Sequence, residues 1–80
     1  MVKVTLVHAR WCTVCPSVRK FWRDLKAEYG FEYEEIDVDT PEGQDFIAKY
    51  GISGVPTTLI EGKIVFVGVP KKVDALSLIG

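Results

Sequence analysis

Hydrophobic residues change their spacing along the chain, and each spacing predicts a type of element. Val2, Val4 and Leu6 alternate with polar residues near the start, which indicates a β-strand. Between residues 13 and 29 the apolar positions recur three or four residues apart, as they do on one face of an amphipathic helix. Gly30 follows at the position where a glycine commonly ends a helix. The beginning of the chain therefore predicts a strand and then a long helix.

Shorter elements are predicted over the rest of the chain. They are a strand over 31–39, a helix over 41–50, two strands over 56–60 and 63–68, and a last helix over 71–79. Acidic residues crowd the first of these strands, FEYEEIDVD, which favours an edge position in the sheet. Thr40 and Pro41 form a typical helix start, an N-cap residue followed by a proline. Glu61 and Gly62 separate the two later strands, which predicts a hairpin turn.

The order of these elements predicts an α/β fold. That order is strand, helix, strand, helix, strand, strand, helix. A right-handed crossover would make the first two strands parallel, and the hairpin would complete a mixed four-stranded sheet with helices on both faces. A chain of 80 residues is long enough for one small hydrophobic core but not for two. We therefore expect a single domain over residues 1–80, built as a three-layer α/β sandwich.

Composition and charge exclude several classes of function. Hydrophobic residues make up 48% of the chain and charged residues 26%, which is ordinary for a globular domain. The formal net charge is −1 and no basic stripe occurs, so nucleic acid is not an expected partner. The apolar runs are far shorter than the ~20 residues that span a bilayer, and the chain start alternates rather than forming a signal-peptide core. We expect a cytoplasmic protein that acts as a monomer and contacts no membrane.

Both cysteines lie in the segment RWCTVCP, residues 10–16, at the predicted start of the long helix. As a structural disulfide the pair would close a very short loop worth only ~2 kcal/mol, and the cytosol would keep it reduced. A zinc site needs about four ligands, whereas the chain offers two cysteines and one histidine. Two other classes stay open: an iron–sulfur cluster carried by a thiolate-bridged dimer, and a non-catalytic binding module.

The position of the cysteine pair favours thiol–disulfide exchange. At the start of a helix, unpaired N–H groups and the helix dipole stabilise an anion, here the thiolate of Cys12. A Cys12 pKa lowered from ~8.5 toward ~7 would raise the thiolate fraction at neutral pH. Cys15, one helical turn further on, would be held in place to attack the mixed disulfide and release the substrate. Cys12 is therefore predicted to be the attacking thiol and Cys15 the resolving thiol.

Two segments resemble the motifs of a known family. WCTVC, residues 11–15, is similar to the WCxxC active site of thioredoxins, and YGISGVPTTLI, residues 50–60, is similar to their YGIxGxPT segment. The short chain and the proline after the second cysteine resemble glutaredoxins. The chain thus resembles the small thioredoxin- or glutaredoxin-like redox proteins of archaea and bacteria. The resemblance implies a thioredoxin-like sandwich, no bound cofactor, and Pro56 as a cis-proline that faces the cysteine pair.

The resemblance also implies a function and partners. Proteins of this type are dithiol–disulfide oxidoreductases that act in electron transport and cell redox homeostasis. Trp11 would belong to the surface that docks target proteins, and the backbone of Val55 would pair with an extended target strand beside the disulfide. We therefore expect a protein-disulfide reductase whose partners are disulfide-containing target proteins and a thioredoxin-reductase-like electron donor.

Two positions depart from the thioredoxin pattern. Thioredoxins carry a buried aspartate six residues before the attacking cysteine, a proposed proton acceptor for the second thiol, and Leu6 stands there in this chain. His8 stands where thioredoxins have an aromatic residue, four residues before that cysteine. An ordinary histidine pKa of ~6.5 suits proton exchange near neutral pH. We therefore hypothesise that His8 accepts the proton of Cys15.

Overall fold

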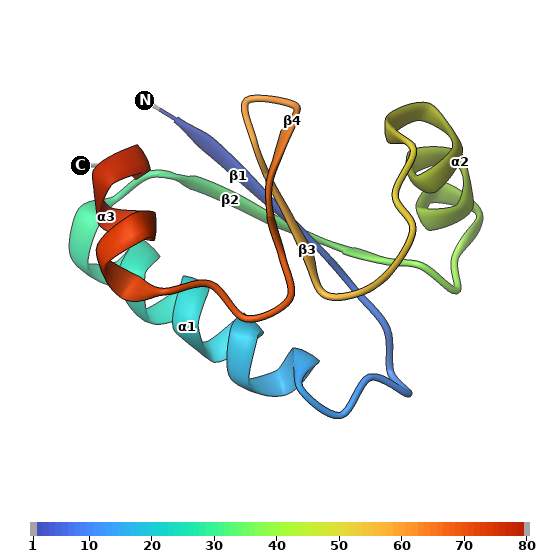
Figure 1. The fold of residues 1–80 in the computed structure, drawn as a ribbon, viewed down its shortest axis with the longest axis horizontal. Coiled ribbons are helices and arrows are strands. Elements are labelled where there is room, and N and C mark those ends of the chain that lie inside the picture. Colours follow the sequence, from blue (N-terminus) through green and yellow to red (C-terminus); the bar gives the residue numbers. More distant parts are fainter. Residues whose placement is uncertain (1, 80) are drawn as a thin grey trace.

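The computed structural model describes residues 2–79 and contains one mixed β-sheet with helices on both faces (Figure 1). In chain order the elements are β1 (Lys3–His8), α1 (Cys15–Tyr29), β2 (Glu32–Asp37), α2 (Pro41–Tyr50), β3 (Thr57–Ile60), β4 (Lys63–Val67) and α3 (Lys72–Ile79). This order is the one predicted from the sequence, and the observed boundaries lie within a few residues of the predicted ones. The predicted α/β sandwich is therefore confirmed.

The four strands lie in the order β2-β1-β3-β4. β1 is parallel to β2 and antiparallel to β3, and β3 pairs with β4 as an antiparallel hairpin. The turn of this hairpin, Glu61 and Gly62, has φ of 53° and 75°, the left-handed geometry that two-residue hairpin turns favour. The acidic strand β2 lies at one edge of the sheet, as predicted.

Helix α1 packs its apolar face against one side of the sheet. Val18, Trp22 and Leu25 are buried, and their spacing is the helical one predicted from the sequence. The indole N–H of Trp22 donates a hydrogen bond to the hydroxyl oxygen of Thr58 at 3.1 Å, so this buried nitrogen has a partner. α1 ends at Gly30, whose φ of 71° is left-handed, as the helix-ending glycine was expected to be.

Helix α2 lies on the opposite face of the sheet from α1 (Figure 1). The hydroxyl of Thr40 accepts a hydrogen bond from the Gly43 N–H at 3.0 Å, and Pro41 is the first helical residue. The predicted start of this helix is therefore confirmed. Three side chains of α2 pack against the core on this face: Phe46, Ile47 and Tyr50.

The buried residues form two clusters, one on each face of the sheet. The cluster under α1 and α3 consists of Val4, Leu6, Val18, Trp22, Leu25, Phe31, Ile60 and Ala75. The cluster on the α2 side consists of Val7, Ala9, Cys12, Cys15, Ile36, Val38, Ile52 and Leu59. Both cysteines are thus part of the packed core on the α2 side. Among the described residues, no helix is long and apolar enough to cross a membrane.

Candidate active site

The cysteine pair lies where the chain passes from β1 into α1. Beyond His8, the last residue of β1, the amide of Cys12 donates a hydrogen bond to the Ala9 carbonyl at 3.3 Å and closes a turn. Cys15 is the first residue of α1, and Pro16 follows in the first turn, where its missing N–H leaves no helical hydrogen bond unmade. A turn and a helix start are both local features, so the sequence alone could predict where the two cysteines lie.

Cys12 and Cys15 are joined by a disulfide. Their Cα atoms lie 5.4 Å apart, within the range of ~4.4–6.8 Å that disulfides span. The two residues differ in access, since Cys12 is 8% exposed and Cys15 is 1% exposed. Cys12 is therefore the more accessible end of the disulfide.

The start of α1 provides a favourable electrostatic environment for a thiolate. Val14 stands at the N-cap, and its apolar side chain cannot accept hydrogen bonds from the first N–H groups of the helix. The first turn of α1, which is described in full, contains no acidic residue. The unpaired N–H groups and the positive end of the helix dipole are therefore available to stabilise an anion at Cys12, just before the helix.

The loop before β3 approaches the cysteine pair from another part of the chain. The Val55–Pro56 peptide bond is cis, as the family resemblance implied, and Pro56 is buried. Val55 packs against the cluster that contains both cysteines. The carbonyl of Pro56 accepts a hydrogen bond from the Gly68 N–H at 2.8 Å, which ties this loop to the residue that follows β4. Two segments that lie far apart in the sequence therefore meet beside the disulfide.

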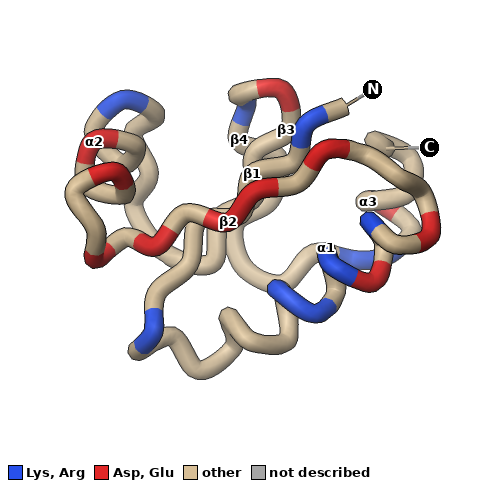
Figure 2. Tube along the Cα trace, turned by 180° about the vertical axis from the view of Figure 1, so that it is seen from behind, with Lys and Arg blue, Asp and Glu red and all other residues tan. Residues whose placement is uncertain are grey.

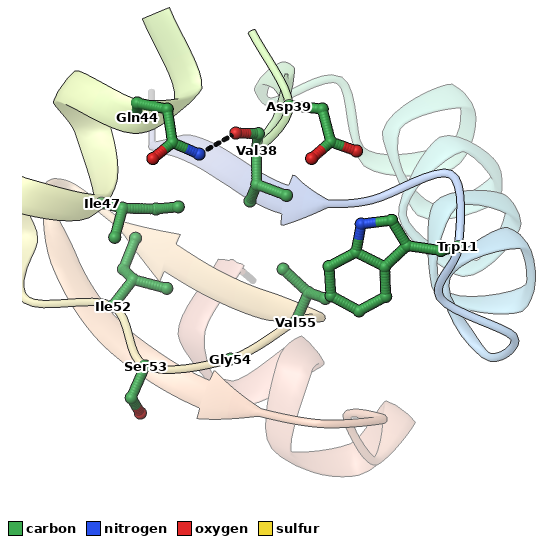
Figure 3. Close-up of a pocket in the computed structure, with 9 residues that line it drawn as sticks. All are labelled: Trp11, Val38, Asp39, Gln44, Ile47, Ile52, Ser53, Gly54 and Val55. Carbon is green, nitrogen blue, oxygen red and sulfur yellow. Dashed lines mark hydrogen bonds between the residues drawn. The ribbon is translucent and has the colours of Figure 1, made fainter. Parts of the chain in front are cut away.

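A groove opens beside the cysteine loop, between this loop and α2 (Figure 3). Its volume is about 210 Å³. Trp11, which is 67% exposed, and Val55 lie on one side of the groove. The lining residues are Trp11, Val38, Asp39, Gln44, Ile47, Ile52, Ser53, Gly54 and Val55. Trp11 and Val55, which were both predicted to contact targets, therefore share one surface.

His8 is buried at the end of β1, with 9% of its surface exposed. Burial lowers the pKa of its imidazole below the ordinary value and Arg19 lowers it further, while Glu35 and Asp37 oppose the shift. The ring is therefore neutral near pH 7. Strand alternation places His8 on the same face of the sheet as Leu6, whereas the cysteines belong to the cluster on the α2 side. Cys15 is the first residue of α1, the helix that packs on the face of the sheet that carries Leu6 and His8.

An ion-pair network joins β2 to α1 on the same face as His8. The carboxylate of Glu35 accepts hydrogen bonds from Arg19 at 3.2 Å, Arg23 at 2.7 Å and the Tyr33 hydroxyl at 2.8 Å. Burial acts to raise the pKa of Glu35, but these hydrogen bonds outweigh it and hold the pKa below its ordinary value. Burial, followed by the contact with Glu35, raises the pKa of Tyr33. Sequence reasoning missed this network, although two arginines one turn apart facing an acidic strand were a signal for it.

The sequence analysis also did not single out most of the groove. Val38 and Asp39 come directly after β2, Gln44 and Ile47 belong to α2, and Ile52 follows α2. Only the tertiary fold brings these residues to Trp11. The helical spacing of apolar residues in α2 showed that one face is buried, but it could not show what that face lies against.

Within residues 2–79, no three His, Cys, Asp or Glu side chains converge to form a group that could hold a metal ion. In this structure the two sulfurs are bonded to each other, so neither is a free thiolate. The chemistry that the pair itself can perform is exchange with another thiol or disulfide.

Comparison with known proteins identifies the family. A family model described as thioredoxin domain matches residues 1–80. The chain belongs to the thioredoxin family. Relatives within the family include a probable thioredoxin of Archaeoglobus fulgidus, 33% identical over 79 residues, which are 99% of this chain and 87% of the relative. A thioredoxin of Methanocaldococcus jannaschii is 30% identical over 71 residues, or 89% of this chain and 84% of the relative.

A solved structure gives the same result. A mutant thioredoxin from Halobacterium salinarum NRC-1 matches with a TM-score of 0.82 and 29% identity, over 98% of this chain and 71% of that chain. This thioredoxin-family chain is a dithiol–disulfide oxidoreductase, and Cys12 and Cys15 form its redox pair. Membership of the thioredoxin family implies that its partners are disulfide-containing proteins and reductase donors.

Proposed function

We propose that the protein reduces disulfide bonds in target proteins, with Cys12 as the nucleophile and Cys15 as the resolving thiol. The observation that supports this assignment most is the difference in access, 8% exposure at Cys12 and 1% at Cys15. The place of Cys12 just before α1, where helix N–H groups favour a thiolate, supports the same assignment. An incoming disulfide would therefore meet Cys12 first.

The proposed exchange has two steps. The Cys12 thiolate attacks one sulfur of the target disulfide, forms a mixed disulfide, and releases the other target sulfur as a thiolate that takes up a proton. Cys15 then loses its proton and attacks the sulfur of Cys12, which releases the second target thiolate and closes the Cys12–Cys15 disulfide. The target gains two electrons and two protons. A reductase donor supplies two electrons to reopen the pair.

Pro56, Val55 and Trp11 are proposed to hold the target beside the disulfide. A proline at position 56 has no N–H that could donate to the thiolate, and its ring would shield the sulfur from metals and other ligands. The backbone of Val55 would pair with an extended target strand, while Trp11 would cover apolar target side chains. The position of Trp11 and Val55 on one groove supports this role.

His8 is proposed to accept the proton of Cys15. Its neutral ring at pH 7 suits a base, because burial and Arg19 hold its pKa below the ordinary value. The ring lies on the face of the sheet that α1 covers, and Cys15 is the first residue of α1. Leu6, at the position where thioredoxins have an aspartate, offers no alternative base.

We also propose that the protein acts as a monomer in the cytoplasm, as one domain over residues 1–80. Thiols are kept reduced in that compartment, so the dithiol form would prevail between turnovers. The electron donor would be a thioredoxin-reductase-like protein, and the biological role would be electron transport in cell redox homeostasis.

Two cysteine variants test the assignment. Cys12→Ser should abolish the reduction of insulin in the presence of dithiothreitol, whereas Cys15→Ser should trap a mixed disulfide through Cys12. Peptide mapping of the trapped complex identifies the joined cysteine, and the double variant serves as the control that traps nothing. Trapping through Cys15 in the Cys12→Ser protein would reverse the two roles. A wild-type protein that does not accelerate insulin reduction would refute the reductase function.

A further inference from the structure

The groove beside the cysteine loop has the size of a side-chain site. Its volume is about 210 Å³. Pockets that enclose a drug-sized ligand are larger, about 300–1,000 Å³. The walls are mainly apolar and come from the cysteine loop, the residues after β2, helix α2, and the loop before Pro56 (Figure 3). A single side chain of a bound target therefore fits this groove better than a cofactor does.

Asp39 is the one charged residue among those that line the groove within the described chain. Its neighbour Asp37 forms an ion pair with Arg10 at 3.5 Å, but none of the ion pairs among residues 2–79 involves the exposed carboxylate of Asp39. Figure 3 shows this carboxylate at the end of the groove near the indole of Trp11. A negative charge next to an aromatic ring therefore stands at the rim of an apolar groove.

Gln44, another of the polar side chains in the groove, also favours a ligand that donates a hydrogen bond. The amide nitrogen of Gln44 donates to the carbonyl of Val38, as the dashed line in Figure 3 shows. This contact occupies the amide nitrogen and leaves the side-chain oxygen of Gln44 as an acceptor. Two acceptors, the Gln44 oxygen and the Asp39 carboxylate, thus belong to a groove in which no Lys or Arg is among the lining residues of the described chain.

Acidic residues also follow the chain next to the groove. Figure 2 shows them continuing from the end of β2 through the connection into α2, whereas those within β2, Glu34, Glu35 and Asp37, are ion-paired with basic side chains. Asp39, Glu42 and Asp45, in this connection and in α2, are exposed. Complementary charge steers an oppositely charged partner toward a site and disfavours partners of like charge. A cationic target segment is therefore the occupant that this surface favours.

We propose that the groove binds an arginine or lysine side chain of the target, close to the cysteine that Cys12 attacks. The aliphatic stem would lie against Val38, Ile47 and Ile52, since long basic side chains bury their methylene groups and keep the charge at the surface. The charged group would reach the carboxylate of Asp39 and the ring of Trp11, which can attract a cation through its π-face. This specificity rests on the reductase function proposed above and adds a substrate class to it.

A set of peptides tests the proposal. Each carries one cysteine as a mixed disulfide with 2-mercaptoethanol and one arginine, norleucine or glutamate, placed in turn at each neighbouring position. The kcat/KM of reduction is measured at 0.15 M salt, where charges more than about 8 Å apart are largely screened. At the preferred position, wild type should reduce the arginine peptide with a kcat/KM about three- to tenfold higher than that for the glutamate peptide. An exposed ion pair changes a binding constant by about 1.5- to fivefold, and repulsion between Asp39 and the glutamate adds to this difference.

Variants of two acidic residues locate the effect. Asp39→Asn should reduce the arginine-to-glutamate ratio to below about twofold, and Asp39→Lys should invert it. The matched control is Glu28→Gln, which removes one negative charge from an exposed residue of α1 outside the groove and should keep the wild-type ratio. Equal rates on all peptides with wild type, or an unchanged ratio in Asp39→Asn, would overturn the proposal and leave the reductase function intact. Failure to reduce any peptide would overturn both.

Discussion

Cys12 and Cys15 occupy different environments although they are separated by three positions. Cys15 begins α1, and the buried face of this helix continues at Val18 and Trp22, three and seven residues further on. Its side chain therefore belongs to the stripe that faces the core. Cys12 lies in the turn before the helix and keeps 8% of its surface exposed. The phase of α1 thus decides which cysteine is more deeply buried, and this asymmetry is the basis for assigning the two roles.

The His8 ring gives a prediction about pH. The folded pKa of His8 is lowered by burial and Arg19, so the ring is neutral at pH 7 and becomes protonated only below its ordinary value of ~6.5. If His8 is the base, the resolving step should slow as the pH falls through that lowered pKa. His8→Ala should lose this inflection and react about tenfold more slowly at pH 7, a smaller effect than the ~10²–10⁴-fold typical of general bases.

Stopped-flow pH–rate profiles of wild type and His8→Ala measure this effect. His8→Gln, which is polar but does not titrate, should behave like His8→Ala. Titration of Cys12 by alkylation identifies the separate inflection that its own ionisation contributes. Profiles of the three proteins that superimpose between about pH 5.5 and 8 would remove His8 from the mechanism.

At the scale of elements, α1 is joined to β2 by the Glu35 carboxylate, which accepts hydrogen bonds from Arg19 and Arg23. Glu35→Gln replaces the charged acceptor by a neutral one and should lower the free energy of unfolding by ~1–3 kcal/mol at pH 7. The folded pKa of Glu35 is depressed, so its contribution is present above the unfolded pKa of ~4.3 and is lost as the pH falls through the lower folded value. Urea unfolding at pH 7 and pH 3 measures both effects.

The control for this prediction is Glu32→Gln, because Glu32 is an exposed acid at the start of the same strand. Its expected change in the free energy of unfolding is within ~0.5 kcal/mol. Equal losses of unfolding free energy in the two variants would contradict a stabilising role of the Glu35 network. A loss in Glu35→Gln that is as large at pH 3 as at pH 7 would contradict it as well.

Helix α1 is also joined to β3, through the hydrogen bond from the Trp22 indole to the Thr58 hydroxyl. Thr58→Val keeps the shape of the side chain but leaves a buried N–H without its partner, which should lower the free energy of unfolding by ~1–3 kcal/mol. Thr58→Ser keeps the hydroxyl and loses one methyl group, a change worth ~0.8 kcal/mol. Guanidinium unfolding followed by circular dichroism compares the two variants. A valine variant as stable as the wild type would show that the hydrogen bond contributes nothing.

At the scale of the whole molecule, the features that could be predicted from sequence are the local ones. Alternating residues marked β1, helical spacing marked α1, and the pair Thr40–Pro41 marked the start of α2. The turn and helix start around Cys12 and Cys15 are likewise set by neighbouring residues. The order of elements then predicted the parallel pair β1–β2 and the β3–β4 hairpin, but not the antiparallel pairing of β1 with β3 that joins them.

The groove and the Glu35 network could not be predicted because they depend on how distant segments pack. The position of Glu35 under α1 follows from the register of β2 against β1, which places it beside Leu6. Asp39 reaches the rim of the groove near Trp11 only because β1 and β2 are parallel, so that the segments after both strands meet at one end of the sheet. The spacing of residues along the sequence therefore predicts neither the position of Glu35 under α1 nor that of Asp39 near Trp11.

The reductase role of the Cys12–Cys15 pair is tested most directly by its reduction potential. The protein is equilibrated in dithiothreitol or glutathione redox buffers, and the reduced fraction is quantified by alkylation and mass spectrometry. We predict a reduction potential of about −270 mV, which is typical of thioredoxin. At this potential the reduced pair passes electrons to target disulfides of higher potential. A potential of about −120 mV, typical of a dithiol oxidant, would contradict the reductase role, because the disulfide would then oxidise the thiols of its targets.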